Sequence, residues 1–247
     1  MTARLAHICR HPIKAHGREE LASVLLSAGA CLPWDRHWAV AHEAARLHDG
    51  WSPCANFSRG AKAPALMAIT ARLDEARAAV TLHHPARGEI TFRPDAPEDL
   101  ARFLDWVRPL VPADRAAPAR IVSAGRGMTD SAFASVAVLS LASLRDLSAR
   151  MGRDLSIHRW RGNLWIEGLA PWAEWDLIGR EIRIGAARLR LEERITRCRA
   201  TMADPETGAI DADTLGALQG AFGHRDFGLY ATVLDGGTVT LHDEVLL

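Results

Sequence analysis

The chain has 247 residues, 48% hydrophobic and 24% charged, which is enough for one large globular domain or two smaller ones. Its 30 Lys and Arg residues balance 30 Asp and Glu residues, so no global positive field exists to attract nucleic acid or anionic lipid. No apolar run approaches the roughly 18 residues of a membrane-spanning helix, so we expect neither nucleic acid nor a membrane as partner.

Strand patterns dominate the first third of the chain. Residues 1–14 lack the continuous apolar segment of a secretory signal peptide. Alternating apolar and polar residues predict strands at 65–73, 79–83 and 89–93.

Two segments carry a helical pattern instead. Apolar residues recur every three or four positions in 97–110 and again in 140–151, and Gly152 supplies a stop signal for the second helix. A segment rich in proline and alanine lies between them, which predicts a domain boundary near residue 115. We therefore expect two units, residues 1–115 and 116–247.

The last third of the chain returns to strands. Residues 182–184 and 189–191 read as a hairpin, and residues 229–234 read as a second hairpin that returns as 238–241 through Asp235-Gly236-Gly237. The fold class is therefore α+β, mainly β, with sheets closed to avoid bare edges.

The four cysteines, Cys9, Cys31, Cys54 and Cys198, are widely spaced and form neither a disulfide framework nor an iron–sulfur pattern. This usage favours a reducing, cytoplasmic location. Because the cysteines form no shared framework, the role of each thiol is considered separately.

Cys198 stands between Arg197 and Arg199 at the end of a strand-like run. Nearby positive charge favours the thiolate, which attacks electrophiles and binds metals. A single thiolate does not suit structural zinc, which takes four protein ligands. A nucleophile, a persulfide carrier, and a ligand to a metal whose other ligands come from a cofactor all remain open.

Four other segments place charged or hydrogen-bonding side chains near strand ends, where loop positions converge on ligands. They are His11–Gly17, Trp34–Val40, Thr129–Ser131 and Arg159–Leu164. Each has a simpler reading. Lys14 could be a solvated loop lysine, Arg36 a surface ion-pair partner of Asp35, Asp130 a turn cap and Asn163 a turn residue.

Taken in order, these segments resemble the MOSC family, named for the C-terminal domain of molybdenum cofactor sulfurases, with its N-terminal β-barrel partner domain. The resemblance covers nearly the whole chain. It is carried by Pro12-Ile13-Lys14, Asp35-Arg36-His37-Trp38, Thr129-Asp130, Arg159-Trp160-Arg161-Gly162-Asn163 and Arg197-Cys198 with Thr201, Asp204-Pro205 and Gly208.

The resemblance implies an N-terminal β-barrel-like domain followed by a MOSC β-barrel, with a site between them. It also implies a molybdenum cofactor (molybdopterin), with Cys198 as both the catalytic residue and the protein ligand to the metal. Family members similar to the amidoxime-reducing proteins imply an oxidoreductase acting on N-hydroxylated or related small molecules. The residues implied to hold the cofactor are Lys14, Arg36, Asp130, Arg159, Arg161, Asn163, Arg197 and Thr201.

Such an enzyme needs a separate electron-donor protein of the ferredoxin or reductase type. Two other functions stay open at this point. One is a sulfur carrier that uses a Cys198 persulfide, and the other is a carrier that holds the cofactor without turnover.

Overall fold

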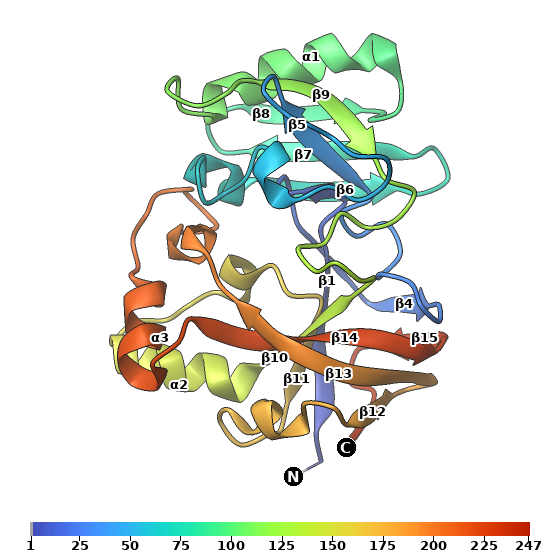
Figure 1. Cartoon of the computed structure of the whole chain (residues 1–247), viewed down its shortest axis with the longest axis vertical. Coiled ribbons are helices and arrows are strands. Elements are labelled where there is room, and N and C mark those ends of the chain that lie inside the picture. Colours follow the sequence, from blue (N-terminus) through green and yellow to red (C-terminus); the bar gives the residue numbers. More distant parts are fainter. Residues whose placement is uncertain (1) are drawn as a thin grey trace.

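The computed structural model describes residues 2–247 and shows two packed units, one above the other in Figure 1. The three α-helices within residues 2–247 are α1 (Pro97–Val107), α2 (Leu141–Met151) and α3 (Thr214–Phe222). The strands are β1 (Arg4–Arg10), β2 (Ile13–Lys14), β3 (Glu19–Leu21), β4 (Ser23–Leu26), β5 (Trp38–His42), β6 (Thr70–Asp74), β7 (Ala79–His84), β8 (Gly88–Phe92), β9 (Pro118–Ser123), β10 (Val136–Ser140), β11 (Leu164–Glu167), β12 (Glu181–Ile184), β13 (Ala187–Thr196), β14 (Asp226–Asp235), β15 (Gly237–Thr240) and β16 (Val245–Leu246). Strands therefore outnumber helices, and the predicted α+β, mainly β class is confirmed.

The lower unit is built on an eight-stranded sheet of order β16-β12-β13-β14-β10-β11-β1-β3. Its strand ladders leave the sheet open, so the closed barrel that we expected is not formed by the ladders themselves. A bridge between Arg4 and Glu244 connects the two sides, and the Val245 N–H donates to the Ala3 carbonyl at 2.8 Å. The first and last segments of the chain thus lie together (Figure 1).

The upper unit holds two three-stranded sheets, β2-β5-β9 and β6-β7-β8, with α1 packed beside them (Figure 1). The apolar face of α1 is buried, as its helical spacing predicts, and Phe103 stacks on Phe92 with ring centroids 4.6 Å apart. This unit therefore has a core of its own.

The two units interlock through their strands. β1 and β3 come from the first 21 residues but join the large lower sheet, whereas β9 pairs with β5 in the upper unit. The chain therefore crosses between the units more than once, and the division near residue 115 stays a prediction.

Most local expectations are confirmed. Ser140 caps α2 by accepting from the Ser143 N–H at 3.3 Å, and Gly152 ends the helix with a left-handed φ of 63°. The helix predicted at 97–110 forms as α1 followed by a 3₁₀ turn, and β12 and β13 form the first predicted hairpin.

Two strand expectations are wrong. Residues 64–68 form a 3₁₀ helix, because Pro64 in its first turn fixes φ near the helical value and offers no N–H to a strand ladder; β6 starts at Thr70. The predicted second hairpin also fails, since β15 pairs with β4 rather than with β14. β13 pairs along one edge of β14, and on the other edge β10 pairs with Leu229–Ala231 while the Gly29 N–H donates to the Val233 carbonyl at 2.8 Å.

None of the helices in residues 2–247 has the length and apolar character needed to cross a bilayer.

Candidate functional site

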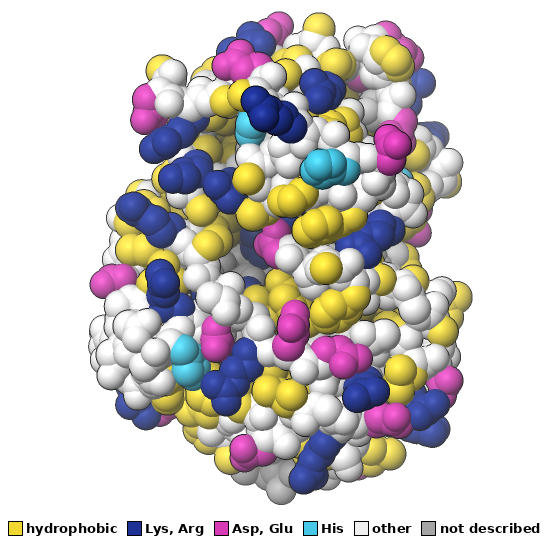
Figure 2. All heavy atoms as spheres, in the orientation of Figure 1, with side chains coloured by type: hydrophobic (Ala, Val, Ile, Leu, Met, Phe, Trp, Pro, Cys, Tyr) yellow, Lys and Arg dark blue, Asp and Glu magenta, His cyan; other side chains and the backbone are white. Residues whose placement is uncertain are grey.

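A pocket of about 280 Å³ lies between the upper and lower units. This volume is close to the lower end of the range of about 300–1,000 Å³ typical of small-ligand sites. All nine predicted site residues line it: Lys14, Arg36, Asp130, Arg159, Arg161, Asn163, Arg197, Cys198 and Thr201. Figure 2 shows a hollow between the two parts of the molecule, with basic side chains around it.

Close contacts between the units lie beside this pocket, and Gly60, Met67 and Ala200 among them also line it. Arg18 donates to the Met67 carbonyl at 3.0 Å and to the Glu206 carboxylate at 2.7 Å. Gly60 approaches Met67 and Ala200 so closely that a Cβ would lie 2.6 Å from the Met67 sulfur. Small residues here let the upper unit pack against the turn that follows Cys198.

Cys198 follows β13 and precedes the 3₁₀ turn Arg199–Met202. Its side chain is exposed and lines the pocket. The Thr201 hydroxyl donates to the Cys198 carbonyl at 3.1 Å and lies 2.7 Å from the Thr214 hydroxyl. Thr201 therefore holds the backbone that presents the thiol, in line with the supporting role that the resemblance implies.

Lys14 lies in β2 and is 5% exposed, so it is not a solvated loop lysine. Its ammonium donates to the Met128 carbonyl and to the Asp130 carboxylate, both at 2.6 Å. Burial lowers the pKa of Lys14, although Asp130 opposes that shift. Partial removal from water inside the pocket would raise the pKa of Asp130, but Lys14 and Arg36 outweigh this effect and the pKa falls.

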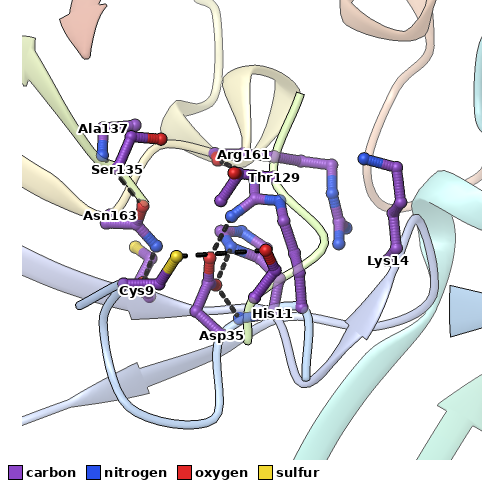
Figure 3. A network of polar contacts seen from close by, with 12 residues as sticks. Cys9, His11, Lys14, Asp35, Thr129, Ser135, Ala137, Arg161 and Asn163 are labelled. Atoms are coloured by element: carbon purple, nitrogen blue, oxygen red, sulfur yellow. Dashed lines mark hydrogen bonds and ion pairs between the residues drawn. The ribbon is translucent and has the colours of Figure 1, made fainter. Parts of the chain in front are cut away.

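Arg36 and Asp35 form a buried ion pair rather than a surface one, because their side chains are only 13% and 1% exposed. Asp35 also accepts from the backbone N–H of His11 at 2.8 Å and lies 3.1 Å from its Nδ1 (Figure 3). Burial opposes the charge of Asp35, but Arg36 and His11 dominate and hold its pKa well below the usual range.

Arg161 and Arg197 present positive charge without a carboxylate partner among residues 2–247. Arg161 donates to the Gly17 carbonyl at 3.1 Å, and Arg197 donates to the Trp160 carbonyl at 2.8 Å and to the Phe227 carbonyl. Burial lowers the pKa of Arg161 to about 9 and that of Arg197 to about 10. An anion in the pocket would relieve this cost.

Arg159 and Asn163 line the pocket, and both form hydrogen bonds to other groups of the protein. Arg159 makes a two-pronged ion pair with Asp211 at 2.7 and 2.8 Å. Asn163 accepts from the Ala137 N–H at 3.0 Å and donates to the Cys9 carbonyl at 3.1 Å (Figure 3). Both residues hold pocket walls in place, and their contact with a cofactor stays a prediction.

The sequence did not identify several other pocket residues. Tyr230 on β14 lines the pocket, and burial raises the pKa of its phenol to about 12. Arg59 also lines it and donates to the Cys54 sulfur at 3.1 Å. Neither Tyr230 nor Arg59 stands within the segments that carry the family resemblance, so no sequence signal pointed to them.

The donor set fits a metal that brings most of its own ligands. Within residues 2–247 no three His, Cys, Asp or Glu side chains are grouped to hold a metal ion. One exposed thiol is instead combined with cations that lack carboxylate partners. A soft thiolate ligand and an anion-binding wall are what an anionic, sulfur-bearing metal cofactor requires.

Two family models match this chain. The model of the MOSC N-terminal beta barrel domain matches residues 2–108, and the model of the MOSC domain matches residues 126–246.

Curated relatives include mitochondrial amidoxime-reducing component 1 of Mus musculus, which is 34% identical over 124 residues, or 44% of this chain and 35% of that protein. Mitochondrial amidoxime reducing component 2 of Bos taurus is 37% identical over 78 residues, or 31% of this chain and 22% of that protein. The chain thus spans about a third of the length of these relatives, or less.

Among solved structures, the YuaD protein from Bacillus subtilis aligns over 99% of this chain and 94% of its own, with 13% identity and a TM-score of 0.46. YiiM from Geobacillus stearothermophilus aligns over 45% of this chain and 53% of its own, with 18% identity and a TM-score of 0.35. The two family models together account for nearly all of the sequence, and the chain therefore belongs to the MOSC family, with a MOSC N-terminal beta barrel domain followed by a MOSC domain.

Proposed function

We propose that this protein binds the molybdenum cofactor in the pocket between its units and reduces N-hydroxylated or related oxygen-bearing small molecules. The observation that supports this most directly is the combination of one exposed thiol, Cys198, with two half-buried arginines that lack carboxylate partners among residues 2–247, Arg161 and Arg197. The names of the curated relatives, amidoxime-reducing components, support the substrate class.

In this proposal the Cys198 thiolate is the protein ligand to molybdenum. Thr201 holds the carbonyl of Cys198 and so fixes the direction from which the sulfur approaches. Lys14, Arg36 and Arg161 supply cationic donors to the phosphate and pterin of the cofactor, where charge-assisted hydrogen bonds are about twice as strong as neutral ones. Asp130 accepts a hydrogen bond from the Lys14 ammonium and orients it.

The cofactor, when bound, supplies the oxidation and reduction chemistry. Reduction of an N–OH group to N–H breaks one N–O bond, consumes two electrons and two protons, and releases water. We assign the electrons to a separate protein of the ferredoxin or reductase type. The relatives are named as mitochondrial, whereas the cysteine usage of this chain leads us to propose a cytoplasmic location.

The test is the metal and pterin content of protein purified from a host that makes the cofactor. We expect molybdenum and pterin in equal amounts in the wild type, and loss of both in Cys198→Ser. Cys54→Ser is the matched control, since it makes the same change in the same pocket and should keep the cofactor. Wild-type protein without molybdenum would contradict the proposal.

The exposed position of Cys198 also suits a sulfur carrier, which is the second candidate. Its signature is a gain of one sulfur mass on Cys198 in protein that holds no molybdenum. A protein that holds intact cofactor but reduces no N-hydroxylated substrate, with a chemical electron donor supplied, would instead be a cofactor carrier.

A further inference from the structure

Asp35 is a buried carboxylate behind the pocket rather than in its lining. Three groups hold it: the backbone N–H of His11 at 2.8 Å, Nδ1 of His11 at 3.1 Å, and the guanidinium of Arg36. Figure 3 shows Asp35 and His11 facing each other below the pocket residues. Burying a carboxylate costs free energy, and these three contacts offset that cost and hold Asp35 in one position.

The backbone of Arg36 is also held on both sides. Its N–H donates to the His11 carbonyl at 2.7 Å, and its own carbonyl accepts from the Met128 N–H at 2.8 Å. Arg36 has a left-handed φ of 51°, which non-glycine residues adopt only where surrounding contacts impose it. The direction in which its side chain leaves the backbone is therefore set by these contacts.

The guanidinium of Arg36 reaches across to the lower unit. Its Nη2 donates to the Arg161 carbonyl at 2.8 Å, while Nη1 stays on Asp35. Arg161 has its own left-handed φ of 48°, and its guanidinium lies against the Gly17 carbonyl at 3.1 Å. A chain of contacts thus runs from Asp35 through Arg36 to Arg161, and it joins two pocket arginines that come from different units.

We infer that Asp35 is a positioning residue for anion binding, which holds Arg36 and, through it, Arg161 in the orientation that a bound anion requires. This deepens the proposed function, on which it rests for the identity of the anion. Arg36 is bidentate between a carboxylate and a carbonyl, and that geometry leaves its remaining N–H groups pointing in fixed directions.

Whether removal of Asp35 strengthens or weakens anion binding distinguishes a positioning role from a purely electrostatic one. Asp35 carries a negative charge close to the pocket, so its removal by electrostatics alone should tighten anion binding. If Asp35 acts by holding Arg36, its removal should weaken anion binding, because the arginine must then be ordered at the moment of binding. If Asp35 only stabilised the fold, its removal would have the same effect on anion binding whether or not Arg36 was present.

The experiment measures the affinity of the purified protein for inorganic phosphate by calorimetry at low ionic strength. Wild type, Asp35→Asn, Arg36→Lys and the double variant form a mutant cycle. We expect Asp35→Asn to weaken phosphate binding about tenfold, the loss of roughly one charge-assisted hydrogen bond. In the Arg36→Lys background the same change should have an effect of less than about twofold.

Glu19→Gln is the matched control. It removes one partner of another buried ion pair, that of Arg10 and Glu19 at 2.7 Å, which lies outside the pocket lining. It should lower stability but leave phosphate affinity unchanged. Unchanged or tighter binding by Asp35→Asn, an equal loss in both Arg36 backgrounds, or no phosphate binding by the wild type would each overturn the inference.

Asp35→Glu keeps the charge but moves the carboxylate, and it should weaken phosphate binding as well. If neither variant folds, the arginine side-chain NMR spectrum of the wild type provides the test. The Arg36 signals, assigned by their loss in Arg36→Lys, should show slow rotation of the guanidinium, and fast rotation would overturn the inference. The protein could show the expected phosphate affinities in this mutant cycle and still never hold molybdenum or pterin. That outcome would contradict the cofactor proposal but support the role of Asp35.

Discussion

Lys14 and Asp130 form an ion pair of 2.6 Å in the pocket lining, although 116 positions separate them in the chain. Lys14 comes from β2 of the upper unit, and Asp130 comes from the loop before β10 of the lower unit. The lysine is buried, whereas the Asp130 side chain is 59% exposed. The pair therefore links the two units at the site itself.

A double-mutant cycle of Lys14→Met and Asp130→Asn should show a coupling of about 1 kcal/mol in the free energy of unfolding. The half-buried setting strengthens the attraction, while the exposed carboxylate limits it. The same cycle on Arg145 and Glu167, which pair at 3.1 Å with both side chains more than half exposed, should give a smaller coupling. Equal coupling in both cycles, measured by chemical denaturation, would show that burial of Lys14 contributes nothing.

Thr201→Val should destabilise the protein by about 1–2 kcal/mol and increase the rate at which iodoacetamide alkylates Cys198. The change removes the bond to the Cys198 carbonyl and leaves the buried hydroxyl of Thr214 without that partner. The control is Thr238→Val, an exposed strand position where we expect no effect on either quantity. Unchanged alkylation in Thr201→Val would mean that Thr201 does not hold the thiol-bearing turn.

Stability should fall as the pH drops, in part because of His16. This side chain is fully buried, and burial lowers its pKa to about 4, although its contact with the Lys14 carbonyl opposes the shift. The folded-state pKa lies below the unfolded value of about 6.5, so the unfolded chain takes up the proton first. The stabilising contribution is present above pH 6.5 and is lost as the pH falls toward 4.

His16→Asn removes this titration while keeping an amide donor near the Lys14 carbonyl. Because comparison of two pH values cancels the packing change, the loss of stability between pH 7 and pH 5 should be about 2 kcal/mol smaller than in the wild type. Denaturant titrations at both pH values measure it. A variant whose pH dependence equals that of the wild type would exclude His16 as a source.

Gly208→Ala should cost about 3 kcal/mol or more, because the new Cβ would lie 2.5 Å from the Cα of Ala65. Gly208 lies in the loop after the 3₁₀ turn Arg199–Met202, so this contact packs the upper unit against the segment that follows the thiol-bearing turn. Gly223 has the same φ of 73° but nothing within 4 Å, which makes Gly223→Ala a control for backbone strain alone. Equal melting temperatures for the two variants would contradict the close-packing explanation.

Local elements could be read from the sequence where a single physical rule acts on neighbouring residues. The apolar stripe of α1 and the cap and stop of α2 are of this kind. The pairing of β15 with β4 was not predictable, since it depends on which strand edges remain free after the large sheet has formed. Residues 65–68 were expected to begin a strand, but they belong to a 3₁₀ helix that starts at Pro64.

The candidate site divides in the same way. The sequence by itself predicted the candidate site residues, Cys198 with its cationic partners, because a residue's charge and chemical type do not depend on the fold; their roles stay a prediction. Only the tertiary structure decided that Asp35 is buried behind Arg36 and that Tyr230 faces the pocket. Those facts depend on contacts between segments that are distant in the chain. The packing of the two units against each other decides which of these segments meet, and the local spacing of residues does not.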